Sequence, residues 1–195
     1  MRKRKIPLPF ALGMILILCG LGVMLFFGVR SRIGGEKCRQ VVEKMAQLLP
    51  ERTPGLPGMS PDPGMPVLEI EGTDYVAQLE IPAFGITLPV ADKWDSGRLS
   101  YGPARFWGSA YDGTLVIGGG DDPRQFGFCD KIEHGAVVTV TDMIGTQFAY
   151  TVSDVDRAGG AKTEWLADAD CDLTLFCHDL YSMEYIAVRC VFAFN

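Results

Sequence analysis

An uncharged stretch at residues 6–28 places the strongest constraint on this chain, because it consists mainly of Leu, Ile, Met, Phe, Val and Gly. As a helix it would be about 34 Å long, enough to cross the hydrocarbon core of a bilayer. The basic residues before it resemble the start of a signal peptide, but the apolar run is too long for one and no small-residue cleavage site follows. We therefore expect an uncleaved, single-pass transmembrane helix in the cell membrane.

The orientation of this helix depends on the charges at its two ends. Residues 1–5 form a compact basic group, while further basic residues follow the apolar stretch closely, so the two sides are nearly balanced. The compact basic N-terminus favours a cytoplasmic position for residues 1–5. The C-terminal part of the chain is then expected to be extracytoplasmic.

Two segments separate the apolar stretch from the rest of the chain. In residues 29–49, apolar residues such as Cys38, Val41 and Met45 recur every three or four positions, which predicts a juxtamembrane helix that Pro50 would end. Residues 50–66 contain six of the chain's twelve prolines, a composition typical of an extended linker. Residues 67–195 are left for one globular domain of ordinary size.

The composition of the globular part limits its partners and cofactors. Residues 68–195 contain eight Lys and Arg against twenty Asp and Glu, a formal net charge of −12. Such a domain cannot easily supply the basic face that a nucleic acid requires, so we expect no nucleic-acid partner. The six cysteines show neither a CxxC pair nor zinc-finger spacing, and we predict no metal or other cofactor.

Short runs rich in β-branched and aromatic residues dominate this domain, and Gly, Pro and Asp separate them. One brief helical pattern lies at residues 162–169. Many short strands with few helices predict a mostly β fold, a closed or nearly closed β-barrel with short helices. The strand-like runs are residues 75–81, 87–90, 114–117, 136–141, 147–155, 173–177 and 185–194.

Residues 75–195 contain a series of short motifs, which are Leu79-Glu80-Ile81-Pro82, Leu88-Pro89-Val90, Gly102-Pro103, Gly108-Ser109, Val116-Ile117-Gly118-Gly119, Phe126-Gly127 and Leu173-Thr174-Leu175-Phe176. In order and spacing this series resembles the sortases, membrane-anchored cysteine transpeptidases of the cell wall in Gram-positive bacteria. The closing Val188-Arg189-Cys190 is similar to the last strand of class B-like clostridial members. The resemblance implies a sortase-like closed β-barrel after the transmembrane helix.

The same resemblance implies which positions should carry catalysis. Sortases use a cysteine thiolate that attacks the scissile carbonyl, a histidine that protonates the leaving amine and an arginine that stabilises the developing oxyanion. Matching the motifs assigns the histidine position to Gly120, the cysteine position to His178 and the arginine position to Tyr185. The resemblance therefore implies a degenerate active site with no intact catalytic residue.

Cys177 lies one residue before the nucleophile position. Because side chains alternate across a strand, this displacement predicts that its sulfur points into the barrel, away from the groove. We therefore expect a pseudoenzyme, with Asp121, His178 and Tyr185 as groove residues. It would act as a peptide-binding or accessory module for sorting-signal peptides of surface proteins, pilins or an active sortase.

Other interpretations stay open on the sequence alone. In the enzyme alternative, a bulge makes Cys177 a displaced nucleophile in an active cysteine transpeptidase or peptidase that cuts cell-wall sorting signals. His134 and His178 are the histidines that such an enzyme could recruit. His178 could also hydrogen-bond Asp121. A disulfide between Cys171 and Cys190 is chemically permitted, although their expected register is diagonal and favours free thiols. A relic without a present role is the third possibility.

Overall fold

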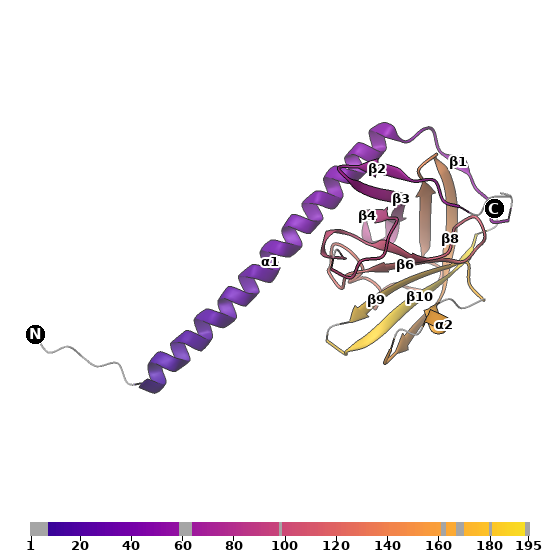
Figure 1. The fold of residues 1–195 in the computed structure, drawn as a ribbon. Helices are drawn as coiled ribbons and strands as arrows, with labels where there is room; N and C mark the ends of the chain where they lie inside the picture. Colours follow the sequence, from indigo (N-terminus) through magenta and orange to yellow (C-terminus); the bar gives the residue numbers. More distant parts are fainter. Residues whose placement is uncertain are drawn as a thin grey trace, which may run out of the picture.

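The computed structural model describes residues 8–58, 64–97, 99–160, 163–166, 170–179 and 181–193. A long N-terminal helix runs beside a β-barrel, and its first half extends away from the barrel (Figure 1). In chain order the elements are α1 (Leu8–Leu48), β1 (Thr53–Pro54), β2 (Leu68–Ile70), β3 (Thr73–Ile81), the 3-10 helix η1 (Pro82–Phe84), β4 (Ile86–Ala91), the 3-10 helix η2 (Leu99–Tyr101), β5 (Ala104–Trp107), β6 (Leu115–Gly119), β7 (Val137–Asp142), β8 (Thr146–Ala158), α2 (Thr163–Leu166), β9 (Leu173–Asp179) and β10 (Glu184–Phe192).

The barrel closes through β7. The sheet runs in the order β8-β10-β9-β6-β5-β4-β3, and β7 pairs antiparallel with both β3 and β8, which joins the two ends. Within this ring β6 and β9 are parallel neighbours, and β9 and β10 form an antiparallel hairpin. The mostly β, closed barrel that the strand pattern predicted is confirmed.

Alternation along the strands builds the barrel core. In β9, for example, Leu173, Leu175 and Cys177 are buried in one continuous apolar cluster with Phe126 and Phe148. Removing such side chains from water supplies about 1.5–3 kcal/mol for each large aliphatic or aromatic residue. The intervening residues of the same strands face the other way, and on β6, β9 and β10 they form the surface described below.

α1 is one uninterrupted helix, whereas the sequence indicated a transmembrane helix followed by a separate juxtamembrane helix. Its C-terminal half lies on the barrel through a stripe that includes Cys38, Val41 and Met45, all buried. Met45 and Val41 pack with Ile70 and Met143 in a small apolar cluster of their own. The helix ends just before Pro50. Its apolar N-terminal part is long and apolar enough to cross a membrane, and the most apolar window is entirely exposed.

The segment interpreted as a linker is partly held against the barrel. Thr53 and Pro54 form β1, which pairs parallel with the start of β8, and Gly55 donates its backbone N–H to the carbonyl oxygen of Gln147 at 2.8 Å. A Cβ on Gly55 would lie 2.6 Å from Thr146, so the absence of a side chain permits this contact. Residues 59–63 lie outside the described residues. Proline favours extended backbone but does not prevent pairing at the edge of a sheet, which is how Pro54 is accommodated.

Candidate functional site

Three adjacent strands, β6, β9 and β10, present a second face on the side opposite the core. Their registers place residues of this outer face in rows that cross the strands. One row contains Val116, Thr174 and Arg189; the next contains Gly118, Phe176 and Ala187; at the end of the strands lie Gly120, His178 and Tyr185. We call the last of these the terminal row.

The terminal row contains the three positions at which the resemblance expects catalytic residues. His178 of β9 pairs with Tyr185 of β10, and their ring centroids are 4.6 Å apart with the planes inclined by 43°. Gly119, the last residue of β6, pairs with Cys177, so Gly120 occupies the register position beside His178. Gly120 is distant in sequence from His178 and Tyr185, yet all three positions lie at one end of one sheet face.

Gly120 has room for a side chain. Its N–H donates to Oε1 of Gln125 at 3.3 Å, and a Cβ built on it would lie 3.4 Å from the same oxygen and 3.5 Å from the carbonyl oxygen of Leu99. These are ordinary van der Waals separations. Asp121, the next residue, is exposed in the turn after β6. Its pairing with His178 stays a prediction.

Cys177 faces the interior of the barrel. Its side chain is 2% exposed, and its thiol donates a weak hydrogen bond to the carbonyl oxygen of Phe126 at 3.7 Å. Burial raises the pKa of the neighbouring Cys129 well above its ordinary value, and a hydrogen bond with Cys177 acts in the same direction. The Cys177 thiol thus lies among buried apolar residues, on the opposite side of the strand from the outer face. His134, the other histidine, is exposed in the turn before β7.

Aromatic side chains cover the row next to the terminal row, which contains Gly118, Phe176 and Ala187. The rings of Trp94, Phe106 and Phe176 lie 5.3 Å from one another, centroid to centroid. Trp94 comes from the loop after β4 and lies directly over Gly118, where a Cβ would be 2.1 Å from Cζ3 of its indole. The chain's own aromatic rings therefore occupy the sheet face immediately next to the terminal row. Sequence reasoning identified Gly118 as a motif residue but not the ring that it accommodates.

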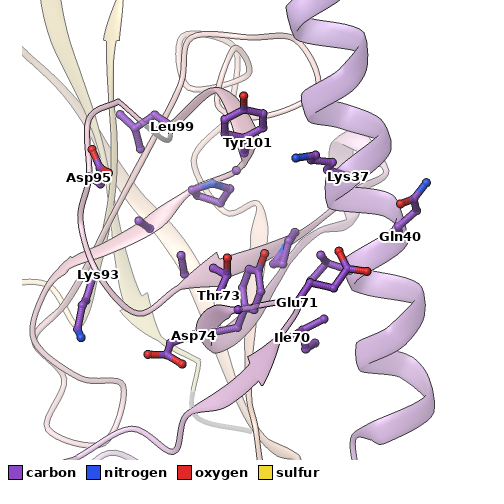
Figure 2. Close-up of a pocket in the computed structure, with 18 residues that line it drawn as sticks. Lys37, Gln40, Ile70, Glu71, Thr73, Asp74, Lys93, Asp95, Leu99 and Tyr101 are labelled. Atoms are coloured by element: carbon purple, nitrogen blue, oxygen red, sulfur yellow. The ribbon is translucent and has the colours of Figure 1, made fainter.

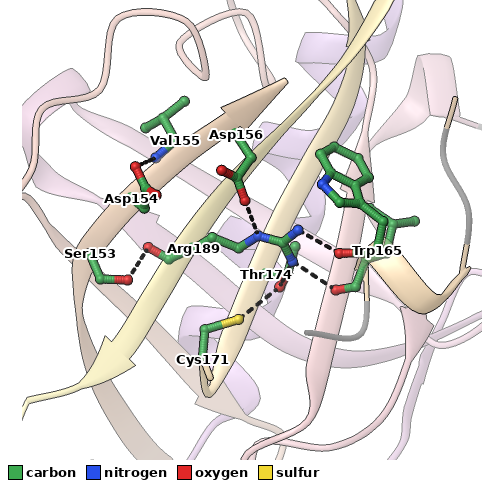
Figure 3. Close-up of polar contacts among 9 residues, drawn as sticks. Ser153, Asp154, Val155, Asp156, Trp165, Cys171, Thr174 and Arg189 are labelled. Carbon is green, nitrogen blue, oxygen red and sulfur yellow. Dashed lines mark hydrogen bonds and ion pairs between the residues drawn. The ribbon is translucent and has the colours of Figure 1, made fainter. Parts of the chain in front are cut away.

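The row of Val116, Thr174 and Arg189 contains a buried arginine with several hydrogen bonds (Figure 3). Arg189 is 4% exposed. Its Nε donates to Oδ2 of Asp156 at 3.0 Å. Its Nη1 donates to Oγ1 of Thr174 at 3.2 Å and to the carbonyl oxygen of Leu166 at 3.1 Å. Its Nη2 donates to the carbonyl oxygen of Trp165, and the guanidinium lies 5.1 Å from the Trp165 ring. Arg189 therefore fastens α2 to the sheet. Its donors are already engaged and it lies two rows away from His178, so it does not replace the arginine missing at Tyr185.

A cavity of about 510 Å³ lies between α1 and the barrel, away from the terminal row. Figure 2 shows Lys37 of α1, Glu71 and Asp74 around the β2–β3 turn, and Lys93 and Asp95 after β4 at its edge. The opposed charges leave it without a clear preference for anions or cations. None of the site residues predicted from the sequence lines it.

Metal and disulfide sites are also absent from the described part of the chain. No group of three His, Cys, Asp or Glu residues there is arranged to hold a metal ion. Cys171 and Cys190 form no disulfide, and Cys190 pairs in register with Leu173, so Cys171 lies diagonal to it. Burial raises the pKa of Cys190 far above its ordinary value, and the electrostatic effect of the nearby Cys171 raises it further.

Comparisons with known proteins agree with the architecture. A family model described as the sortase domain matches residues 79–192, and no curated protein matches. Similar solved structures include a sortase C from Clostridium perfringens SM101 (21% identity, 62% of this chain and 71% of that one, TM-score 0.50) and a sortase D5 transpeptidase from Clostridium perfringens (17%, 62% and 79%, 0.53). Sortase A from Corynebacterium diphtheriae is 19% identical over 85% of each chain, with a TM-score of 0.55. The fold is therefore shared with sortases of several classes. Because the family model covers more than half of its length, this chain belongs to the sortase family.

Proposed function

We propose that this chain is a membrane-anchored, extracytoplasmic member of the sortase family that lacks transpeptidase activity and binds peptide or protein partners without cutting them. The observation that carries the proposal is the position of the Cys177 thiol inside the barrel, with 2% of the side chain exposed. A thiol buried in the barrel cannot reach a peptide carbonyl on the outer face.

The terminal row supports the same conclusion from the chemistry of its residues. Acyl transfer to a thiol requires a nucleophile, a group that exchanges protons and donors aimed at the oxyanion. Gly120 can perform none of these roles. His178 can exchange protons, but it occupies the nucleophile position, and Tyr185 offers one donor without positive charge. We infer that the row cannot carry out the reaction of the family.

Binding makes fewer demands, and the terminal row can meet them. The His178 and Tyr185 side chains are half-buried, so part of each stays accessible to a partner. Such groups can stack on side chains of an extended peptide and hydrogen-bond its backbone. A solved Clostridium perfringens sortase C contains a C-terminal cell wall sorting motif. Sorting-signal peptides are therefore the first partners to test, followed by pilins and an active sortase.

The test uses the full chain in lipid nanodiscs with a fluorescent sorting-signal peptide and an amine nucleophile. We expect no cleavage or transfer product by mass spectrometry, but an increase in peptide anisotropy on titration with protein. Tyr185→Ala should weaken that binding about tenfold through loss of stacking and a hydrogen bond. Ile144→Ala, at the opposite end of the barrel, is the matched control and should bind normally. A product that disappears in Cys177→Ala would overturn the proposal and support the displaced-nucleophile enzyme.

A further inference from the structure

The first turn after β6 is attached to α1 close to the apolar stretch. The hydroxyl of Ser31 donates to Oδ2 of Asp122, and Nη1 of Arg124 donates to the Ser31 hydroxyl at 2.7 Å. Gly35, one helical turn further on, allows the Arg124 side chain to cross the helix, since a Cβ there would lie 2.8 Å from Cδ of Arg124. Ser31 is only three residues beyond the end of the apolar stretch at Gly28, which is about 4.5 Å along a helix axis.

The β9–β10 turn lies at this same end of the barrel. β6 and β9 are parallel neighbours, so the turn that follows β6 and the turn that follows β9 leave the sheet at one edge. Figure 1 shows the end of β9 and the start of β10 pointing toward the side on which the N-terminal half of α1 extends. The contact between Ser31 and Asp122 thus fixes the position of the β9–β10 turn along the axis of α1, close to the end of the apolar stretch.

This turn displays two large apolar side chains. Tyr181 is 99% exposed and Met183 is 65% exposed. The carboxylate of Asp179 accepts hydrogen bonds from the Tyr181 N–H at 2.8 Å and from the Ser182 hydroxyl at 2.7 Å. Met183 adopts a left-handed φ of 60°, which is rare for a residue with a side chain and turns the chain back into β10. Tyr181 and Met183 therefore point away from the barrel next to residues that are held by hydrogen bonds.

We propose that the β9–β10 turn is a second membrane contact, in which Tyr181 and Met183 enter the headgroup region of the bilayer that α1 crosses. The proposal rests on the membrane anchoring proposed above. A tyrosine at the interface keeps its ring among apolar groups and its hydroxyl in water, and methionine adapts to irregular apolar surroundings. The terminal row, which ends where this turn begins, then lies at the membrane surface, and a partner reaches His178 and Tyr185 along the bilayer.

The charges around the turn define what kind of lipid contact this is. Asp179 and Glu184 flank it, and Asp179 has an ion-pair contact with Arg157 at 3.7 Å. Acidic residues do not attract anionic lipids. The contact must therefore depend on insertion of Tyr181 and Met183, and its strength should not increase with the proportion of anionic lipid.

The opposite end of the barrel provides a matched control. Ile144, in the β7–β8 turn, is 58% exposed. Its neighbour Gly145 approaches Pro50, where a Cβ would lie 3.2 Å from the proline ring, so this turn lies beside the C-terminal end of α1. That end is twenty residues beyond Gly28, or about 30 Å along the helix. A probe at Ile144 should stay in water.

The experiment places a tryptophan at either position in the full chain, reconstituted in vesicles with lipids brominated near the headgroup or deep in the acyl chains. After subtraction of the wild-type signal, Tyr181→Trp should be quenched at least about twofold more strongly by the shallow label than Ile144→Trp. Equal quenching of the two variants in protein that floats with the vesicles would overturn the proposed contact while leaving the anchoring intact. Protein that does not float with vesicles after alkaline extraction would overturn the anchoring and the contact together.

Discussion

Cys177 and His178 are consecutive in β9, yet their side chains lie on opposite sides of the barrel wall. The Cys177 thiol contacts the carbonyl oxygen of Phe126 in the core, whereas the His178 ring stacks with Tyr185 on the outer face. A shift of one residue along β9 therefore separates the buried Cys177 thiol from the outer-face position at which a thiol could attack a peptide.

That separation predicts a difference in thiol reactivity. On a Cys177→Ala background, a thiol introduced by His178→Cys should react with a water-soluble methanethiosulfonate at least about tenfold faster than Cys177 does in the wild type, because only the outer-face thiol is accessible. Labelling is followed by intact-protein and peptide mass spectrometry. Similar rates at the two positions would show that Cys177 leaves the core readily, in favour of the enzyme alternative.

Replacement of Arg189 tests the attachment of α2. Arg189→Met should lower the free energy of unfolding by about 2–3 kcal/mol, because it removes the buried cation from Asp156 and leaves the carbonyl groups of Trp165 and Leu166 unpaired. Arg157→Met is the control: its ion pair with Asp179 is exposed, so the loss should be under about 0.5 kcal/mol. Urea unfolding measures both. Equal losses would contradict a structural role for the Arg189 contacts.

Gly118→Ala should displace Trp94. The new methyl group would overlap the indole, and such overpacking lowers stability by about 1–3 kcal/mol. In a Trp94→Ala background the same substitution should be tolerated much better, which a double-mutant cycle measures. Gly159→Ala, where nothing described lies within 4 Å of the new Cβ, controls for a general effect of losing glycine. Equal losses with and without Trp94 would exclude the overlap as the cause.

Tyr150→Phe should stabilise the barrel. Among the described residues, the buried Tyr150 hydroxyl has no hydrogen-bond partner, so removing it eliminates a desolvated polar group and should gain about 1 kcal/mol. Tyr111→Phe provides the contrast, because that hydroxyl donates to Asp142 and its loss should destabilise the protein by about 1 kcal/mol. The urea midpoints of the two variants should shift in opposite directions, and shifts of the same sign would contradict this assignment.

Alkaline pH should destabilise the protein. Burial raises the pKa of Cys190 and of Tyr150 above the ordinary values of 9.0 and 10.0 that these groups regain on unfolding. Their contribution to stability is therefore complete below about pH 8 and is lost as the pH rises further, because the unfolded chain releases protons that the folded chain retains. The urea midpoint should fall between about pH 8 and pH 10.5, and the fall should be smaller in Tyr150→Phe. A midpoint that is constant over this range would contradict the prediction.

The fold could be predicted largely because its main strands carry strong local signals. Runs such as residues 75–81 and 147–155 correspond to β3 and β8, where β-branched and aromatic residues alternate with polar ones. β2 and β5 were not identified, since strands of three and four residues are too short to show a clear alternation of apolar and polar residues. The continuity of α1 was also not predicted, because a change from apolar to amphipathic pattern indicates a change of environment and not a break in the helix.

The candidate site was predictable in position but not in surroundings. Motif spacing predicted that Gly120, His178 and Tyr185 belong to one site; His178 and Tyr185 pair in register, and the catalytic equivalence of the three positions stays a prediction. Neither Trp94 nor Ser31 carried a signal, because both act across the fold. Arg189 did carry one: a charged residue within an apolar strand must find buried partners, and Asp156 could have been sought on the neighbouring strand.

Because α1 is one unbroken helix, it also fixes the rotation of the barrel about the helix axis. An α-helix advances about 100° around its axis with each residue, so inserting or deleting one residue between Gly28 and Ser31 would turn the barrel by that amount relative to the apolar half of the helix. Seven inserted residues, close to two full turns, would nearly restore the original heading while raising the barrel by about 10 Å. The height and the heading of the terminal row are thus coupled, because both are set by the number of residues in a single helix.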